Sequence, residues 1–471
     1  MFEASKKALK RASQWWADQR GGSATFIALA MIPLVGSMGV ATDVARSMLV
    51  KNRLTESLDA ASLAAGRQSN ESQRAADADR YFWANYVDGY LGTAVDGPHL
   101  QNGPDDTVIL TATAELPTTF STFFGLQSIS IDGRSVVQRN LRGMELVLVM
   151  DNTGSMRGSG KMAAMKDAAQ TLVDTLYGDR ETVTNFWVSL VPYAASVNIG
   201  PNRTSWLDAS FNSTAYDLDP NGWKGCVEAR QAGLDMTDDV PTIGPWRALL
   251  WNSDDPAEHN ASDSYYNVWP QVKWENYHQN GGRGPNLGCP QPITSLQASK
   301  GTITSGISQM EPWHRGGTMS HMGLVWGWRV LSPEWRGLWG GDTPSSLPTD
   351  YDDQDIDKVV ILLTDGVNEW YQDDFTAYRR LSEGLLGTTS KSQTTNILNT
   401  RMAQICADMK AEGVKIYTLT FRLSNNNTKQ LFRDCASAPY SEHYFDSPSN
   451  DTLKENFELI AEKLSRLRIS E

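Results

Sequence analysis

The fold of this chain is decided by "ELVLVMDNTGSM" (residues 145–156), an apolar run that ends in acidic and hydroxyl side chains. A continuous apolar run of this length is typical of a central parallel strand that is covered on both faces. Just beyond its end, Asp151, Thr153 and Ser155 stand at alternating positions. Two chemistries use such a loop: metal binding through oxygen ligands and phosphoryl transfer through an aspartate. Features elsewhere in the chain are needed to distinguish metal binding from phosphoryl transfer.

Apolar runs and helical stretches alternate on the C-terminal side of this stretch. Apolar residues recur at helical spacing from Met162 to Leu176, and further helices are expected at about 395–412 and 451–466. Buried strands are expected at "NFWVSLV", "KVVILLTDG" and "KIYTLTF". Strands and helices in alternation predict a doubly wound α/β domain over residues 143–471.

Between Pro192 and about Met310 the alternation stops. Residues 193–310 are rich in Gly, Pro, Asn, Asp and Trp and are too long for a simple loop, so we expect a Trp-rich subdomain inserted at one end of the sheet. Of the 16 tryptophans in the chain, 11 lie between Trp206 and Trp339. They could form a stacking surface for sugars or a partner, but small irregular cores built on large rings are the favoured interpretation.

The N-terminal part of the chain predicts a membrane anchor. A basic head (residues 1–22) precedes residues 23–42, which carry no charge. A membrane span needs roughly 20 predominantly apolar residues, and its basic side tends to stay in the cytoplasm. A cleaved signal peptide is the alternative, but no small-residue cleavage site follows directly, which favours the anchor.

The helical pattern continues past the anchor and ends at Gly66. Its expected apolar stripe consists of Val44, Met48, Leu54, Leu58, Ala61 and Ala65. A second helix is expected around residues 71–90, and "TVILTATAEL", "SISIDG" and "SVVQRN" alternate in the manner of strands. Residues 43–142 are therefore predicted to form a small module of helix and sheet, as in pilin-like subunits.

The segment "RGGSATFIALAMIPLVGSMGVATDVARSMLVKNRLTESLDAASLAAG" (residues 20–66) resembles the start of the TadE/TadG-like proteins of Tad (Flp) pilus assembly. It carries their D-v-a-R step at Asp43 and Arg46, and their alanine-rich tail in "LTESLDAASLAA". The resemblance implies a pilus-assembly protein with one membrane anchor. The glutamate that Flp pilins carry just inside their processing site is missing, so we expect neither cleavage by prepilin peptidase nor entry into a filament core.

Charge and cysteine content restrict the functional classes. The formal net charge is −13 with a pI near 5.0, and without a basic patch no nucleic-acid partner is expected. The four cysteines form no C-x-x-C pair, which argues against the usual zinc and thioredoxin motifs. In an exported protein an even count indicates disulfides, and proximity favours Cys226–Cys289 and Cys406–Cys435, although four cysteines allow three pairings. Buried free thiols are the alternative.

Three loops are expected to bring oxygen atoms to one edge of the sheet. Ligands of doubly wound sheets bind beyond the carboxyl ends of the strands. "DNTGS" follows the first strand, "TDG" places Asp365 after another, and "GGT" places Thr318 at the start of a helix. Each residue alone would more commonly cap a helix. Together they form an oxygen-only set suited to a hard, octahedral cation such as Mg²⁺.

This order of motifs resembles the metal-ion-dependent adhesion site of von Willebrand factor A domains. The resemblance implies that Thr153 and Ser155 bind the metal directly, and that Thr318 does so when a ligand is engaged. It also implies that Asp151 and Asp365 act directly or through water, and that a carboxylate of the partner fills the vacant coordination position. The resemblance covers roughly residues 143–192 and 311–471. His314 and His321 lie near Thr318 in sequence but are interpreted as exposed or packing residues.

Two other functional classes stay open. "DNTGS" also resembles the phosphorylated loop of haloacid-dehalogenase-like phosphotransferases, in which Asp151 would attack phosphorus. One membrane span cannot form an ion pump, "GGT" has no role in that chemistry, and no lysine stands in an obvious matching loop. A cytoplasmic chelatase-type A domain that partners an AAA ATPase is the second alternative, and it requires reduced cysteines and no membrane span.

The favoured prediction is a non-enzymatic, single-pass protein of the bacterial inner membrane with most of its chain in the periplasm. It would serve Tad/Flp pilus assembly or adhesion, and the cell surface is a further possible location. Its Mg²⁺ site would capture an Asp or Glu of a protein partner, such as a pilus or secretion-apparatus subunit.

Overall fold

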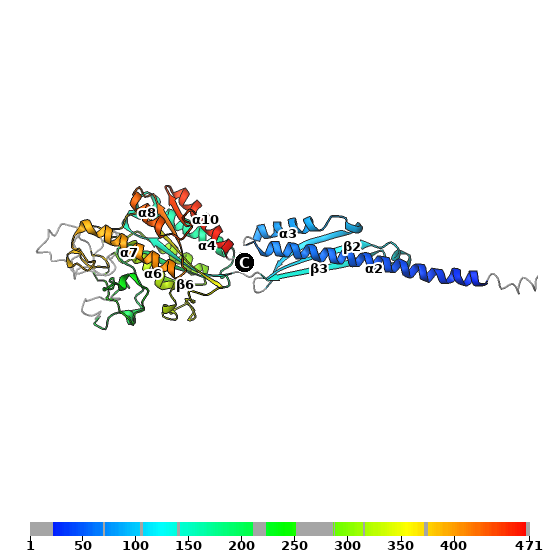
Figure 1. The fold of residues 1–471 in the computed structure, drawn as a ribbon, viewed down its shortest axis with the longest axis horizontal. Coiled ribbons are helices and arrows are strands. Elements are labelled where there is room, and N and C mark those ends of the chain that lie inside the picture. The colour runs from blue at the N-terminus through cyan, green and yellow to red at the C-terminus, as the bar shows by residue number, and fades with distance from the viewer. Residues whose placement is uncertain are drawn as a thin grey trace, which may run out of the picture. The chain divides into compact units, whose positions relative to one another are not determined.

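A computed structural model describes residues 22–68, 71–103, 107–138, 142–210, 223–250, 286, 288–313, 316–371 and 375–467. The chain divides into two compact units between Asn140 and Leu141, and each is described by itself (Figure 1). The predicted basic head, apart from Gly22, lies outside the described residues, as does His314.

The N-terminal unit is a long helix that lies on a three-stranded antiparallel sheet, with a second helix beside it (Figure 1). The sheet has the order β1-β2-β3. The elements are α2 (Gly22–Gly66), α3 (Glu71–Asn85), η2 (Tyr90–Gly92), β1 (Ala94–Asn102), β2 (Thr107–Pro117), η3 (Ser121–Phe124) and β3 (Ser128–Gln138). Helix α2 ends at the predicted Gly66, and it includes a stretch long and apolar enough to cross a membrane.

The core of this unit forms between the apolar face of β2, helix α3 and one stripe of α2. The predicted stripe is confirmed at Leu54, Leu58, Ala61 and Ala65 but is wrong at its start, because Val44 and Met48 are exposed. The face of α2 that turns toward the sheet and its loops instead continues N-terminally through Val50, Arg46 and Asp43. At this end of α2 the face that packs on the unit therefore carries polar side chains, where an apolar stripe was predicted.

Two predictions about the strands of this unit need correction. "SISIDG" and the first four residues of "SVVQRN" belong to the single strand β3, which pairs with β2 along its whole length. Strand β1 was not expected, because Gly97 and Pro98 interrupt its alternation and the register shifts there.

The C-terminal unit contains a six-stranded sheet with β4 in its interior and the order β11-β10-β8-β4-β5-β6. Neighbouring strands are parallel except β6, which runs antiparallel to β5 at the edge. This is the expected doubly wound α/β sheet. Its strands are β4 (Gly143–Asp151), β5 (Phe186–Tyr193), β6 (Thr294–Gln297), β8 (Ile356–Thr364), β10 (Lys415–Phe421) and β11 (Tyr444–Ser447).

Helices cover both faces of this sheet, so β4 and β8 are buried along their whole lengths. One face packs on α6 (Ser320–Leu331), α7 (Lys391–Ala411) and α8 (Asn426–Cys435). The other packs on α4 (Lys161–Tyr177), α5 (Lys300–Gln309) and α10 (Asn450–Leu467). The short α9 (Tyr440–His443) precedes β11. Because both faces of β4 pack against a hydrophobic core, its sequence shows no alternation of apolar and polar residues.

The range 193–310 contributes β6 and α5 to the sheet and its helical layer. Its described tryptophans are buried, and so are those that follow it as far as Trp339. The rings of Trp206 and Trp335 meet edge to face with centroids 5.0 Å apart, and those of Trp246 and Trp326 are also 5.0 Å apart. For the described part of the chain, the interpretation of these residues as core is confirmed.

Both predicted disulfides form. Cys226 bonds to Cys289 across 63 residues, and Cys406 bonds to Cys435 across 29. The second bond joins α7 to α8 on one face of the sheet. The first closes the chain around part of the Trp-rich insertion.

Candidate metal centre

The carboxyl ends of β4 and β8 place two acids side by side. The strands are parallel neighbours in the sheet, and each ends just before or at the acidic loop that follows it. Asp151 is the last residue of β4, and Asp365 follows the last residue of β8. The backbone nitrogen of Asp365 lies 3.4 Å from Asp151 Oδ2. The predicted meeting of these two loops therefore occurs.

Asp151 is fully buried, and hydrogen-bond donors surround its carboxylate. Oδ1 accepts the backbone N–H of Thr153 at 2.8 Å, and Oδ2 accepts the hydroxyl of Thr364 at 2.7 Å. The hydroxyl oxygen of Tyr193 lies 3.4 Å from Oδ2. Burial raises the pKa of Asp151 to about 6, and the negative charge of Asp365 contributes to this rise against the effect of the hydrogen bonds. A cation at this edge would favour the ionised carboxylate.

The hydroxyls of the first loop face Asp365. Thr153 Oγ1 lies 2.9 Å from Ser155 Oγ, and Ser155 Oγ donates a hydrogen bond to Asp365 Oδ1. Thr153 is buried, whereas Ser155 is exposed to solvent. The loop thus offers oxygens in a row that begins inside the protein and ends at its surface.

Thr318 reaches the same place from the third loop. It lies in the two-residue strand β7 (Gly317–Thr318), which pairs with β9 (Glu369–Trp370) just after the "TDG" loop. A β-carbon on Gly366 would lie 3.5 Å from Thr318 Oγ1 and 3.7 Å from Ser155 Oγ. The two hydroxyls therefore flank one point beside Gly366, and all three predicted loops converge there.

Lys161, the first residue of α4, adds a positive charge to the site. Its ammonium nitrogen lies 2.6 Å from Asp365 Oδ2, and its side chain is mostly buried. The sequence shows no lysine in an obvious matching loop, and Lys161 reaches Asp365 from the first turn of α4 instead. Lys161 thus compensates one of the two negative charges.

Sequence analysis also missed the supporting roles of Thr364, whose hydroxyl donates to Asp151, and of two further residues, Tyr193 and Asn368. The Tyr193 hydroxyl donates to the carbonyl of Leu363 at 3.0 Å and so connects the ends of β5 and β8. Asn368 Oδ1 accepts the N–H of Ser320 at 3.0 Å, which caps α6 directly after Thr318. Thr364 and Asn368 lie within the motif "TDGVN", so the sequence contained a signal for these two residues. No motif marks Tyr193.

The residues at this edge fit a hard divalent cation. The five predicted residues supply two carboxylates and three hydroxyls, all of them oxygen donors. The described residues contain no group of three or more His, Cys, Asp or Glu side chains that could hold a metal ion, so the hydroxyls are needed to complete a ligand set here. His321 is buried, contacts the Tyr378 hydroxyl at 2.8 Å, and has its pKa lowered to about 3 by burial and by Arg401. Its interpretation as a packing residue is confirmed.

The same geometry disfavours Asp151 as a nucleophile. An attacking carboxylate must present an oxygen to the substrate, but the side chain of Asp151 has no exposed surface. Both of its oxygens already accept hydrogen bonds from the protein. Asp151 is placed to orient its neighbours and to supply charge rather than to attack phosphorus.

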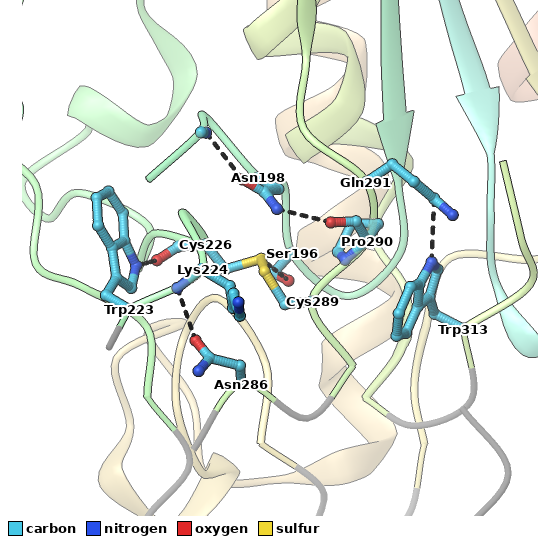
Figure 2. The surroundings of a disulfide bond; sticks show 11 residues. Ser196, Asn198, Trp223, Lys224, Cys226, Asn286, Cys289, Pro290, Gln291 and Trp313 are labelled. Atoms are coloured by element: carbon cyan, nitrogen blue, oxygen red, sulfur yellow. Dashed lines mark hydrogen bonds between the residues drawn. A yellow bond between two sulfur atoms is a disulfide. The ribbon is translucent and has the colours of Figure 1, made fainter. Parts of the chain in front are cut away.

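The Trp-rich insertion borders this loop. Asn152 Nδ2 and Trp313 Nε1 each donate to Gln291 Oε1 at 3.1 Å. Figure 2 shows Gln291 beside Pro290, next to the Cys226–Cys289 bond. The disulfide therefore fixes a segment that contacts the loop carrying the Thr153 and Ser155 hydroxyls.

Backbone contacts also join the loop after β4 to the segment that contains Trp313. The Trp313 backbone N–H donates to the Asn152 carbonyl at 2.6 Å, and a β-bridge pairs Trp313 with Thr153. Beside Gln291, Asn198 Nδ2 donates to the Pro290 carbonyl at 2.8 Å (Figure 2). The rim of the site is thus built by segments that are far apart in sequence.

Comparison with known families identifies the N-terminal segment. Residues 22–68 match the family described as Flp pilus-assembly TadE/G-like. The match contains Asp43 and Arg46 and covers the part of the chain for which the resemblance was noted, so that part of the prediction is confirmed. It does not extend into the C-terminal unit. A search of curated proteins finds no significant match.

A comparison with solved structures finds matches to pilus proteins and to von Willebrand-type domains. The pilus adhesin SpaC from Lactobacillus rhamnosus GG has 12% identity and a TM-score of 0.35, over 79% of this chain and 34% of that one. The vWF domain of the type V pili tip protein Mfa5 from Porphyromonas gingivalis has 10% identity and a TM-score of 0.36, over 69% and 95%. Proximal thread matrix protein 1 from the mussel byssus, with a zinc-occupied MIDAS motif, has 12% identity and a TM-score of 0.30, over 68% and 46%. This chain spans about a third of the length of SpaC. Similarity at this level carries no functional information.

Proposed function

We propose that this chain is a membrane-anchored protein of Tad/Flp pilus assembly or adhesion that binds a partner carboxylate through a Mg²⁺ site. The observation that carries the proposal is the convergence of Asp151, Thr153, Ser155, Thr318 and Asp365 at one edge of the sheet. The Tad family match at residues 22–68 supplies the pilus context. The proposed activity is binding, without catalysis.

The five residues divide into two roles in this proposal. Thr153 and Ser155 bind the cation through their hydroxyls, and Thr318 joins them when a partner is engaged. Asp151 and Asp365 supply negative charge, directly or through water. The bound cation would offer a vacant coordination position to an Asp or Glu of the partner, in keeping with the preference of Mg²⁺ for oxygen ligands.

The Trp-rich insertion is proposed to provide specificity. It contacts the metal loop through Gln291, whose side-chain oxygen accepts hydrogen bonds from Asn152 and Trp313. A partner that reaches Ser155 must therefore approach past this rim. Rim contacts of this kind select among partners that all offer the same carboxylate.

The proposed location is the periplasmic side of the bacterial inner membrane, with one span in residues 23–42. The apolar start of α2 supports a span, and the two disulfides support an oxidising compartment. A chelatase-type domain beside a cytoplasmic ATPase would need reduced cysteines and no span, so neither feature favours it.

Capture from membranes tests the proposal directly. The full chain, immobilised in detergent, is expected to retain partner proteins in Mg²⁺ and to release them in EDTA, because the cation bridges the two surfaces. Mass spectrometry of the released fraction should identify pilus or secretion-apparatus subunits, and calorimetry of the purified chain should detect binding of Mg²⁺ alone. Equal capture in Mg²⁺ and EDTA would contradict the proposal.

Gly317→Ala is expected to weaken Mg²⁺-dependent capture by roughly 10- to 100-fold, the range found when groups that position metal ligands are lost. Gly317 has a φ of 101°, and a β-carbon there would lie 2.2 Å from the carbonyl oxygen of Glu369. The substitution must therefore separate β7 from β9 and move Thr318. The capture assay and calorimetry measure the effect.

Gly341→Ala is the matched control for this prediction. Gly341 also has a positive φ, of 62°, but a β-carbon there would meet no atom within 4 Å. It should lose a little stability and no metal binding. If Gly317→Ala captured the partner as well as the control did, Thr318 would have no part in the site.

A further inference from the structure

The loop between β2 and β3 exposes a group of large apolar side chains for which the proposed metal site has no use. Its sequence, "TTFSTFFGLQ" (residues 118–127), contains no charged residue. Four of its side chains are exposed: Phe120 (39%), Phe123 (87%), Phe124 (70%) and Leu126 (50%). An exposed apolar group of this kind marks a contact with a partner or a membrane.

The loop is docked on the apolar part of α2. A β-carbon on Gly39 would lie 2.6 Å from the side chain of Phe120, and one on Gly36 would lie 3.2 Å from the ring of Phe124. Both glycines lie inside the uncharged run that is proposed to cross the membrane. The absence of a side chain at Gly39 is what lets Phe120 approach so closely.

Asp43 fastens the loop to the helix. Its side chain is fully buried, and its carboxylate accepts three backbone N–H groups, from Thr119 at 3.0 Å, Phe120 at 2.9 Å and Ser121 at 2.8 Å. Three hydrogen bonds to one buried carboxylate fix the position of a loop far more firmly than apolar contact alone.

Arg46 adds a second attachment one turn further along α2. Its guanidinium donates to the Thr119 hydroxyl at 2.7 Å and to the Leu91 carbonyl at 2.9 Å, and it lies 3.5 Å from Asp43. Asp43 and Arg46 form the D-v-a-R step noted in the sequence, and both lie within the family match. In this protein their contacts hold the loop against the helix.

The position of the loop along α2 identifies what covers it. Asp43 is the first charged residue after the uncharged run, and Gly39 and Gly36 lie four and seven residues before it. At about 1.5 Å per residue, the phenylalanines meet the helix ~6 to ~10 Å inside the apolar segment. If that segment lies in a bilayer, a loop packed on its side at this depth lies in the boundary between headgroups and acyl chains.

We propose that residues 118–127 are a second membrane contact. Phe123, Phe124 and Leu126 insert into the leaflet at the Asp43 end of the apolar segment. The occupant of this apolar surface is lipid, since the surface is continuous with the exposed apolar side chains of α2. The absence of charge in the loop predicts insertion without preference for anionic lipid. The inference rests on the proposed membrane span, and its test separates the two.

Nitroxide labels on the full chain in phosphatidylcholine liposomes test the proposal. Single cysteines are introduced as Phe123→Cys in the loop, Leu29→Cys in the apolar part of α2 and Val136→Cys on β3. Electron paramagnetic resonance then compares collisions with oxygen, which concentrates in lipid, and with a water-soluble nickel complex. The label at 123 should show high oxygen and low nickel accessibility at a depth of roughly 5–10 Å.

The label at 136 is the matched control, since Val136 is also an exposed apolar residue of this unit but lies toward the end of β3 that meets Gly66. It should remain accessible to nickel. If the label at 29 lies in lipid while the label at 123 is as accessible to nickel as the label at 136, the loop proposal is wrong and the span stands. A label at 123 that is shielded from both reagents would show protein contact, and would also overturn it.

A third outcome separates the loop from the anchor. If the label at 29 is accessible to nickel, α2 does not cross the bilayer, and both the span and the loop proposal fail. As a second variant, Asp43→Asn weakens the attachment without removing any apolar surface. It should raise the nickel accessibility of the label at 123 several-fold and leave the label at 29 unchanged, and no change at 123 would deny Asp43 its fastening role.

Discussion

Asp151→Asn should weaken Mg²⁺ binding by about 100-fold or more, with the same loss in Mg²⁺-dependent capture. Two unit charges 4 Å apart interact by about 4 kcal/mol at an effective dielectric constant of about 20, and a doubly charged cation roughly doubles that value. Partial compensation by solvent still leaves a loss of about 2.7 kcal/mol, which corresponds to the 100-fold change. Isothermal titration calorimetry with Mg²⁺ measures the affinity of the variant.

Asparagine is the appropriate substitution because it preserves the shape of the buried side chain. Its oxygen can accept the Thr153 N–H, and the hydroxyls of Thr364 and Tyr193 can rotate to accept its NH₂ group. The variant should therefore fold, which thermal unfolding checks. Asp179→Asn, which removes one charge from an exposed position away from the site, should bind Mg²⁺ normally. Unchanged affinity in Asp151→Asn would refute the metal site.

Lys358→Met should destabilise the C-terminal unit by about 3–5 kcal/mol, the cost of leaving a buried charge without its partner. Lys358 on β8 faces Glu145 on β4 as its direct neighbour in the sheet, with Nζ 2.5 Å from Glu145 Oε2. The side chain of Glu145 is fully buried, and its other oxygen accepts the Thr349 N–H at 2.7 Å. Urea unfolding of the chain in detergent, followed by tryptophan fluorescence, measures the loss.

The double variant Glu145→Gln/Lys358→Met distinguishes an unpaired charge from lost packing. It leaves no charge in the core and keeps an acceptor for the Thr349 N–H, so it should recover most of the stability. Lys415→Met removes a lysine whose partner, Asp357, lies 3.0 Å away in a more exposed pair, and it should cost less than about 1 kcal/mol. A double variant as unstable as Lys358→Met would show that the methylene packing of the lysine matters more than the charge.

Much of the fold follows from local patterns in the sequence. The apolar run before Asp151 predicts a central strand, helical spacing predicts α4, α7 and α10, and the continuous pattern from residue 43 predicts that α2 ends at Gly66. These signals are local because strand and helix periods are set by backbone geometry. These signals fail where a different face of a helix becomes buried. Val44 and Met48 are an example, because they face away from the sheet and its loops.

The candidate site follows from the sequence only through a rule about sheets. Parallel strands present their carboxyl ends at one edge, so "DNTGS", "GGT" and "TDG" could be expected to meet there. The sequence does not say that β8 lies directly beside β4, and this neighbourhood is what brings the Asp365 backbone to within hydrogen-bond distance of Asp151. Strand order depends on how helices cover both faces, which no local pattern records.

The sequence by itself determined the residue types at the candidate metal site and the long apolar stretch of α2, and proximity along the chain favoured the cysteine pairing that forms. Only the tertiary structure decided that Lys161 balances the charge of Asp365 and that Asp43 fastens a loop 76 residues away. Each of these contacts joins segments that are far apart in the chain, and no sequence pattern predicts that they meet. The packing of the hydrophobic cores fixes the position of each strand and helix. Only that packing brings the side chains of distant segments into contact.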